Sequence, residues 1–322
     1  LVVALVRHAQ LRLRVAPVWS LPVALVALEF VYPLLFPSYI GNSQYKFTVL
    51  TQIVEITGVL GLSAIIGLLN GAAYELLAAK LDARRLAPVR MIVPLALVGV
   101  SIVYGMIRLP DIDAATASAE TIKVGMVQTN LGSHDKATSP AKFMREHLRM
   151  SSELLRKRPD IDLLVWPESV YYGFIRKDQS QQASKAIAAL GKPTIMGALS
   201  IDDANRDGEA EYFNSVVLMS SEGELLSSFD KVELLAFGET LPLSRLIPAV
   251  GKLFGGSWFT HANSFEHLRL GDTTFLPTVC YEDIIPSLPR RIWRNDGPAN
   301  VLVNVTNDSW YGNTHQPMIH LP

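Results

Sequence analysis

Three apolar, strand-like runs of the sequence each end at a side chain that could do chemistry. Glu168 follows Leu-Leu-Val-Trp-Pro, Lys231 follows Ser-Ser-Phe-Asp, and Cys280, the only cysteine, follows Leu-Pro-Thr-Val. A buried strand gains nothing from a carboxylate, an ammonium or a thiol at its end unless these groups meet at a site. The repeated placement therefore predicts one candidate site built from these three residues.

The three groups together fit nucleophilic catalysis. A thiolate at Cys280 can attack an acyl carbon and form a thioester, and a carboxylate at Glu168 can take the thiol proton and return it to a leaving group. The ammonium of Lys231 is expected to depress the pKa of the thiol and to stabilise a tetrahedral oxyanion. The competing interpretation is a small buried core cysteine and two solvated surface charges. The shared position at strand ends favours the catalytic interpretation.

The elements that would position these residues begin near residue 121, where short apolar runs alternate with amphipathic segments. Apolar positions at helical spacing predict helices over 140–157 and 179–190. Strands are predicted over 122–128, 163–166, 193–199, 216–220, 225–230, 274–280 and 301–305. This alternation is typical of an α/β domain with mixed strands, which we expect to occupy residues 121–322.

Three long apolar segments, about residues 15–37, 49–71 and 89–107, precede this domain. Each has roughly 19–23 residues, the length that crosses a hydrocarbon core, so we predict three transmembrane helices within residues 1–107. Buried helices of a large soluble protein are the alternative. Residues 108–120 are polar and small, and we expect them to form a linker.

The charged residues around and within these spans predict an orientation. Basic residues gather before the first span and between the second and third, namely Arg7, Arg12, Arg14, Lys80, Arg84, Arg85 and Arg90, whereas the loop between the first two spans has only Lys46. The positive-inside rule then places the basic ends in the cytoplasm and the domain after the third span on the outer face. Glu29 and Glu55 lie inside the first two spans, where they either line a lipid or substrate groove or serve as hydrogen-bonded packing groups.

Composition excludes several classes of function. With a net charge of −1 and 18% charged residues, the chain has no basic stripe for nucleic-acid phosphates. A single cysteine allows neither an internal disulfide nor a cysteine-based zinc site. The seven histidines show no metal-binding spacing, so we expect neither a metal nor another cofactor.

Several motifs of the second half resemble the nitrilase, or carbon–nitrogen hydrolase, superfamily, and more narrowly its membrane-bound apolipoprotein N-acyltransferase family. They are Trp-Pro-Glu-Ser at 166–169, Asp-Lys-Val-Glu-Leu-Leu-Ala-Phe-Gly-Glu at 230–239, Cys-Tyr-Glu at 280–282, Asn-Val-Thr-Asn-Asp-Ser-Trp-Tyr-Gly at 304–312 and Gln-Pro at 316–317. Each motif alone is weak, but their order and the preceding membrane segments make the set specific. The resemblance implies an α-β-β-α sandwich after the membrane helices.

The resemblance also implies roles for individual residues. Glu168 would be the general base, Lys231 the oxyanion-stabilising lysine and Cys280 the nucleophile. Supporting or substrate-binding positions would be Glu239, Tyr281 and Glu282. This chain has Ala236 and Thr240 where the family usually has proline and tyrosine, which changes the stiffness of the loop and removes one aromatic contact.

The implied reaction moves a fatty acyl chain from a membrane phospholipid, through a thioester on Cys280, to the N-terminal amine of the diacylglyceryl-cysteine of an apolipoprotein. The implied location is the bacterial inner membrane, with the catalytic domain on the periplasmic face. The family has further membrane helices, so we expect this chain to be truncated at both ends. A membrane-tethered amidase or nitrilase shares the triad and is the main alternative, and a non-catalytic scaffold with a degenerate domain is the second.

A long apolar segment after Lys231, residues 234–259, is interrupted by Gly251, Gly255 and Gly256. Such a segment beside the site is able to dip into the bilayer and cover an acyl chain. Ordinary packing on the sandwich is the alternative interpretation.

Overall fold

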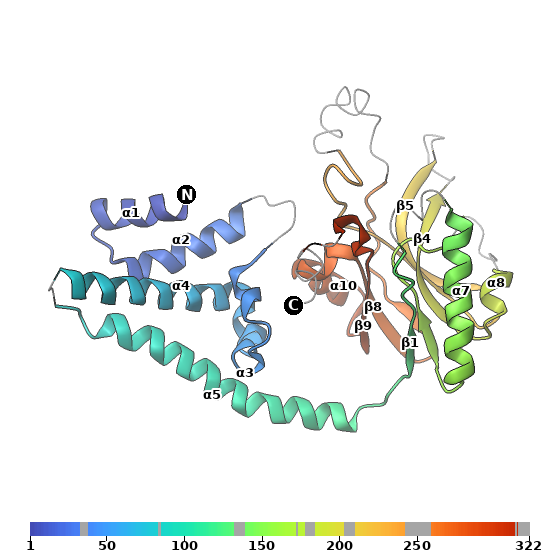
Figure 1. Cartoon of the computed structure of the whole chain (residues 1–322), viewed down its shortest axis with the longest axis horizontal. Coiled ribbons are helices and arrows are strands. Elements are labelled where there is room, and N and C mark those ends of the chain that lie inside the picture. Colours follow the sequence, from blue (N-terminus) through green and yellow to red (C-terminus); the bar gives the residue numbers. More distant parts are fainter. Residues whose placement is uncertain are drawn as a thin grey trace. The chain divides into compact units, whose positions relative to one another are not determined.

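The computed structural model divides the chain into two compact units, Leu1–Glu120 and Thr121–Leu321 (Figure 1). It describes residues 1–32, 38–82, 85–131, 139–171, 173–177, 184–202, 210–241, 259–312 and 314. The first unit is helical and the second contains every strand of the described residues.

The first unit consists of α1 (Val2–Arg12), α2 (Pro17–Val31), η1 (Ile40–Gln44), α3 (Thr48–Thr51), α4 (Val54–Leu81) and α5 (Val89–Ser118). Helices α2 and α4 pack closely through small residues. A Cβ on Gly71 of α4 would lie 2.6 Å from the Cα of Val18, so only glycine allows the two backbones this approach. Small residues at such contacts are typical of helices that pack within a membrane.

Two helices of this unit, α4 with 28 residues and α5 with 30, are long and apolar enough to cross a membrane. The first predicted span, 15–37, is shorter in the structure, because α2 ends at Val31 and residues 33–37 lie outside the described part of the chain. The second predicted span begins later, at Val54, and continues to Leu81.

The predicted linker over 108–120 is wrong for most of its length, since α5 runs unbroken to Ser118. Polar character does not end a helix, and the alanines of this stretch are strong helix formers. Pro110 lies inside the helix without ending it.

The two acidic residues of the spans are both engaged in hydrogen bonds. Glu29 accepts one from the backbone N–H of Ile40 at 2.7 Å. Glu55 forms an ion pair with Arg108 at 2.7 Å and accepts a hydrogen bond from the hydroxyl of Tyr104. These partners favour the interpretation of Glu29 and Glu55 as packing groups.

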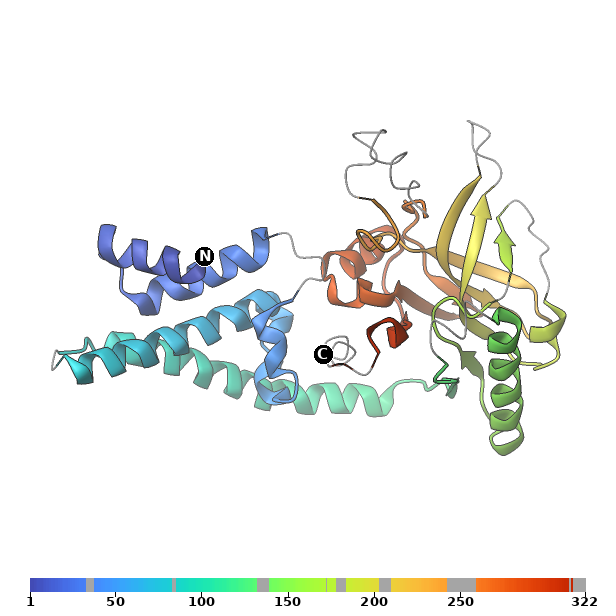
Figure 2. The same ribbon diagram turned by 45° about the horizontal axis from the view of Figure 1, so that its top comes forward.

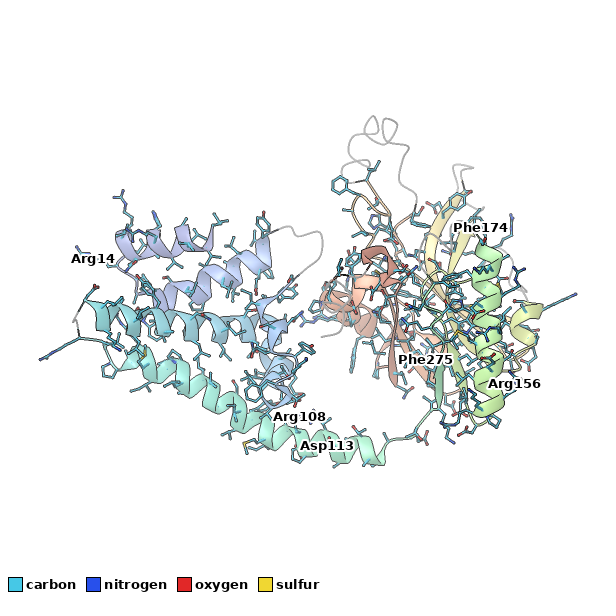
Figure 3. The ribbon with its side chains drawn as sticks, in the orientation of Figure 1. Arg14, Arg108, Asp113, Arg156, Phe174 and Phe275 are labelled. Carbon is cyan, nitrogen blue, oxygen red and sulfur yellow. The ribbon has the colours of Figure 1, made fainter. Side chains whose placement is uncertain are left out.

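The second unit contains two sheets. The larger has strands β1 (Val124–Met126), β2 (Leu163–Val165), β4 (Thr194–Asp202), β5 (Glu211–Met219) and β6 (Leu225–Asp230) in that order, with β3 (Phe174–Arg176) also paired to β4. The smaller has β7 (Leu268–Leu270), β8 (Thr273–Val279) and β9 (Val301–Val305). Strands β5 and β6 contact β7 and β8, so the sheets face each other, and Phe275 of β8 is fully buried (Figure 3).

Helices cover the outer faces of the sheets. Helix α7 (Pro140–Lys157) packs Phe143 into a core with Trp166 and Met196 of the larger sheet, and Figure 2 shows α7 along that sheet. The short α8 (Lys185–Ala188) adds Ile187 to the same core. Helix α10 (Ser287–Asp296) lies against β8. The predicted α/β sandwich is therefore confirmed.

Candidate active site

Strand direction brings two of the candidate residues to the same edge of the larger sheet. Strand β4 is parallel to β2 and antiparallel to β5, and β5 is antiparallel to β6. Strands β2 and β6 therefore run the same way, and the residues that follow them, Glu168 and Lys231, lie near each other. Cys280 follows β8 of the smaller sheet, so the site draws on both sheets.

Glu168 is held by a turn pressed against β4. A Cβ on Gly197 would lie 2.3 Å from the nitrogen of Ser169 and 2.4 Å from the Cα of Glu168, so glycine is required at this position. The Gly197 N–H donates to the carbonyl of Pro167, and its carbonyl accepts from Val170. Ser169 has a φ of 55°, which turns the chain sharply after Glu168.

Lys231 lies between two carboxylates. Its Nζ is 2.8 Å from Glu239 Oε2 and 3.9 Å from Glu168 Oε1, and its side chain is only 2% exposed. The amide of Asn214 donates to both carboxylates at 2.7 Å. Burial lowers the pKa of Lys231, but the negative charges of Glu168 and Glu239 outweigh it and raise the pKa, so the lysine is a fixed cation.

Cys280 occupies a bend that few non-glycine residues adopt. Its φ is 55° and the residue is 9% exposed. The backbone of Tyr281 and the side chain of Thr306 hydrogen-bond the sulfur. Thr306 also accepts a hydrogen bond from the N–H of Glu168 at 3.5 Å, and the N–H of Asn307 donates to Glu168 Oε2 at 3.0 Å. The chain after β9 therefore links the thiol to the carboxylate.

The electrostatics of the thiol differ from the sequence prediction. Burial and the Glu168 carboxylate raise the pKa of Cys280 to about 12, and the opposing effect of Lys231 does not cancel them. Lys231 does lower the pKa of the thiol, as expected, but its effect is outweighed, because a site that excludes water disfavours a free thiolate. In the resting protein Cys280 is a thiol beside a carboxylate that can accept its proton.

Tyr281 and Glu282 have different positions. The ring of Tyr281 lies 5.2 Å from Lys231 Nζ, and burial raises the pKa of its hydroxyl. Glu282 accepts three backbone hydrogen bonds, from Val232, Glu233 and Val279, at 2.8–2.9 Å. Burial raises the pKa of Glu282 to about 7. Glu282 thus ties the chain after β6 to the end of β8, whereas Tyr281 faces the lysine.

The segment that carries Glu239 is a tight turn. The N–H of Leu235 donates to Glu239 Oε2 at 2.9 Å, and the N–H of Phe237 donates to the carbonyl of Thr240 at 2.7 Å. Phe237, with a φ of 64°, is 73% exposed. Most of the proposed covering segment, residues 242–258, and the Gln-Pro of 316–317 lie outside the described residues.

Three residues of the site were not singled out from the sequence: Asn214, Thr306 and Asn307. Asn214 is a buried amide within β5, and a polar residue in an apolar strand is the signal that could have found it. Thr306 and Asn307 fall within the 304–312 motif, but no contact was assigned to them. In the described part of the chain, no group of three or more His, Cys, Asp or Glu residues could hold a metal ion.

Comparisons with known proteins match both units. The carbon–nitrogen hydrolase family model matches residues 123–321, and the model of the apolipoprotein N-acyltransferase N-terminal domain matches residues 1–72. Among solved structures, Nit3 of Saccharomyces cerevisiae, a member of branch 10 of the nitrilase superfamily, is 17% identical with a TM-score of 0.43, over 63% of this chain and 72% of that one.

Two curated relatives carry the name apolipoprotein N-acyltransferase. The protein of Geobacter metallireducens is 32% identical over 94% of this chain and 58% of its own length. The protein of Bdellovibrio bacteriovorus is 29% identical over 91% of this chain and 56% of its own length. The chain thus spans about half the length of the curated relatives it matches. It belongs to the carbon–nitrogen hydrolase, or nitrilase, superfamily and, within it, to the apolipoprotein N-acyltransferase family.

Proposed function

We propose that the chain carries the catalytic centre of an N-acyltransferase that uses a cysteine thioester. The observation that supports it most is the buried cluster in which Lys231 lies between Glu168 and Glu239, with Glu168 close enough to raise the pKa of the Cys280 thiol. A nucleophile, a base and a fixed cation in one water-poor site suit acyl transfer better than any structural purpose.

In the first half-reaction, Cys280 Sγ attacks the ester carbonyl carbon of a phospholipid acyl chain. Glu168 takes the thiol proton as the S–C bond forms, so no free thiolate has to exist in the buried site. The ammonium of Lys231 stabilises the tetrahedral oxyanion. The C–O bond then breaks, Glu168 returns the proton to the departing alkoxide, and a lysophospholipid leaves the thioester.

In the second half-reaction, the α-amine of an apolipoprotein's diacylglyceryl-cysteine attacks the thioester carbonyl. Glu168 accepts a proton from the nitrogen, the C–S bond breaks, and the sulfur recovers that proton. Glu239 and Asn214 would hold Lys231 and Glu168 in position through both steps, since the amide of Asn214 donates hydrogen bonds to both carboxylates. The side chain of Tyr281 would line the oxyanion site beside Lys231.

The lipid donor is supported by the two long apolar helices α4 and α5 and by the family to which the chain belongs. Both indicate a membrane protein. We propose that the sandwich lies on the periplasmic side of the inner membrane, because the basic residues gather at the other ends of the spans. A protease-protection assay on intact spheroplasts tests this side: cleavage of the sandwich from outside is expected, and protection would contradict it.

The reaction class is tested by incubating the purified protein with a phospholipid that carries a labelled acyl chain and measuring the intact mass. We expect an acyl adduct that is absent from Cys280→Ala and is discharged by a diacylglyceryl-cysteine peptide. A membrane-tethered amidase would instead hydrolyse small amides and form no adduct with the phospholipid. That result would contradict the proposal.

A further inference from the structure

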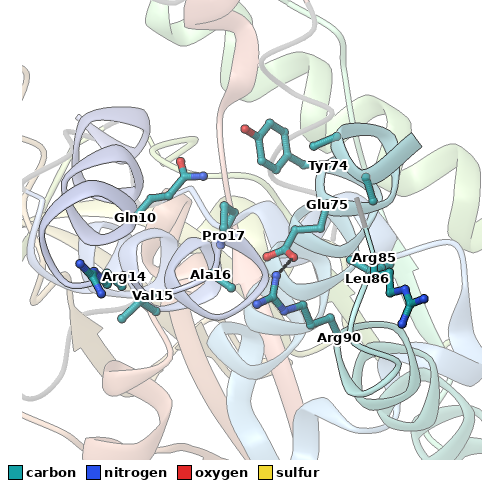
Figure 4. A pocket seen from close by; sticks show the side chains of 12 residues that line it. Gln10, Arg14, Val15, Ala16, Pro17, Tyr74, Glu75, Arg85, Leu86 and Arg90 are labelled. Carbon is teal, nitrogen blue, oxygen red and sulfur yellow. Dashed lines mark hydrogen bonds and ion pairs between the residues drawn. The ribbon is translucent and has the colours of Figure 1, made fainter. Parts of the chain in front are cut away.

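A polar cavity lies within the helical unit, where α1, α2 and the end of α4 meet the segment that precedes α5 (Figure 4). Its volume is about 240 Å³. Sites that enclose a drug-sized ligand measure about 300–1,000 Å³, so this cavity suits a more compact group. Three arginines, Arg14, Arg85 and Arg90, line it together with one carboxylate, Glu75.

The carboxylate is already satisfied by the protein. Glu75 is 6% exposed and forms an ion pair with Arg90, drawn as a dashed line in Figure 4. Its other oxygen accepts a hydrogen bond from the N–H of Val18 at 3.3 Å, at the beginning of α2. Glu75 thus fixes Arg90 and the first turn of α2 as one wall of the cavity.

Among the described residues, the remaining cations have no such partner. Arg14 and Arg85 are exposed and form no ion pair with any residue that the structure describes. Three arginines against one glutamate leave the cavity lining with a formal charge of +2. The partial positive charge at the N-terminus of α2 adds to this field. An anion is the ligand that such a lining would bind.

The residues around the cavity favour a lipid as the ligand over a small solute. Tyr74, at half exposure, also lines the cavity, and tyrosine is enriched where a membrane meets water. Nearby on α4, Leu77 is 57% exposed and Leu81 75% exposed. These leucines offer an apolar surface next to the charged lining. A phosphate bound at the arginines would therefore have its acyl chains against α4.

We propose that this cavity binds the phosphate of an anionic phospholipid headgroup beside Arg90, with the charges of Arg14 and Arg85 at the two ends of the lining favouring the anion (Figure 4). Basic pockets between membrane helices are suited to such headgroups. The site is distinct from the catalytic cluster and would anchor a lipid that is not consumed. Its assignment does not depend on the proposed acyl transfer.

The test uses the purified chain in phosphatidylcholine nanodiscs that contain a small fraction of spin-labelled phosphatidylglycerol. We expect the double variant Arg14→Gln/Arg85→Gln to lower the relative association constant of the labelled lipid by about tenfold. The matched control is Arg7→Gln/Arg12→Gln, which removes the same charge from exposed positions of α1 that do not line the cavity, and it should lower binding by less than half.

Two results would overturn the proposal. An equal loss in both double variants would mean that the preference is general attraction to basic residues rather than binding in the cavity. Displacement of the labelled lipid by millimolar inorganic phosphate, with chloride at matched ionic strength as the reference, would mean that the cavity takes a free phosphate. Circular dichroism of each variant checks that the helices remain folded.

Discussion

Two of the clusters in which a buried carboxylate meets a cation have opposite charge balance. In the sandwich, Glu168 and Glu239 face the single ammonium of Lys231. In the helical unit, Glu75 faces three arginines in one cavity. The first cluster has an excess of negative charge and the second an excess of positive charge.

The opposite charge balance indicates which chemistry each cluster can support. Excess carboxylate in a buried site raises the pKa of the Cys280 thiol and, in the proposed mechanism, supplies a base for its proton. Excess guanidinium in an open cavity attracts an anion and gives no acid–base chemistry at neutral pH, because arginine does not lose its proton. Burial also differs: Lys231 is 2% exposed, whereas Arg90 is 38% exposed.

The largest expected effect is on catalysis by the sandwich cluster. Glu168→Gln keeps the shape of the side chain but removes the base, so acyl-enzyme formation should fall by about 10²–10⁴-fold, measured as the rate of acyl adduct formation. The control is Glu224→Gln, an exposed residue of the turn before β6, which should retain the rate. A loss of less than threefold in Glu168→Gln would remove Glu168 from the mechanism.

The next largest expected effect is on the free energy of unfolding, and it should differ between the two clusters. Lys231→Met leaves two buried carboxylates without their cation, and removing one partner of a buried ion pair costs about 3–5 kcal/mol. Arg90→Met also strands a carboxylate, but water can reach the more exposed pair, so its loss should be smaller. Denaturant unfolding of both variants in detergent measures the difference. Equal losses would contradict the contrast in burial.

A smaller loss of stability should follow from a substitution that crowds the backbone of the sandwich. Gly197→Ala places a methyl group within 2.4 Å of the turn that holds Glu168, and overpacking of this kind costs about 1–3 kcal/mol. The rate of adduct formation should fall with it, because Glu168 is displaced. Gly99→Ala, where a Cβ meets nothing within 4 Å, is the matched control. An unchanged adduct rate in Gly197→Ala would show that the turn can relax without moving Glu168.

The smallest effect is the pH dependence of stability due to Glu282. Its pKa in the folded protein, about 7, lies above the value of about 4.3 for an unperturbed glutamate, so the folded state binds this proton more tightly than the unfolded state. The stabilisation is complete below about pH 4.3 and is lost as the pH rises to about 7. The thermal midpoint of the wild-type protein should therefore fall, relative to that of Glu282→Gln, between these values. Parallel curves would contradict the raised pKa.

Much of the sandwich was predictable because its elements are local. Residues 140–157 have apolar positions at helical spacing, and α7 has these bounds. Strands β6 and β9 also have their predicted bounds. Strands β3 and β7 have three residues each, too few to show a period, and they depend on pairing with β4 and β8. Helix α5 was predicted too short because polarity was taken as an end signal.

The candidate site was predictable in its residue types but not in its electrostatics. Glu168 and Lys231 each follow an apolar run, which is visible in the sequence, whereas the strand directions that bring them together come from the pairing within the sheet. Asn214 connects Glu168 to Glu239, but an amide in the middle of a strand has no motif of its own. The net direction of the Cys280 pKa depends on burial and on the distances to two opposite charges, which no local pattern contains.

The central claim is that Glu168 and Lys231 act on the Cys280 thiol in opposite directions. It is tested most directly by the pH dependence of Cys280 alkylation with iodoacetamide, followed by mass spectrometry between pH 6 and 10.5. We predict that the wild-type rate still rises at the highest pH, that Glu168→Gln shifts the profile to lower pH, and that Lys231→Met shifts it to higher pH. Three superimposable profiles with a midpoint near about 8.5, the value for a free cysteine, would contradict the account.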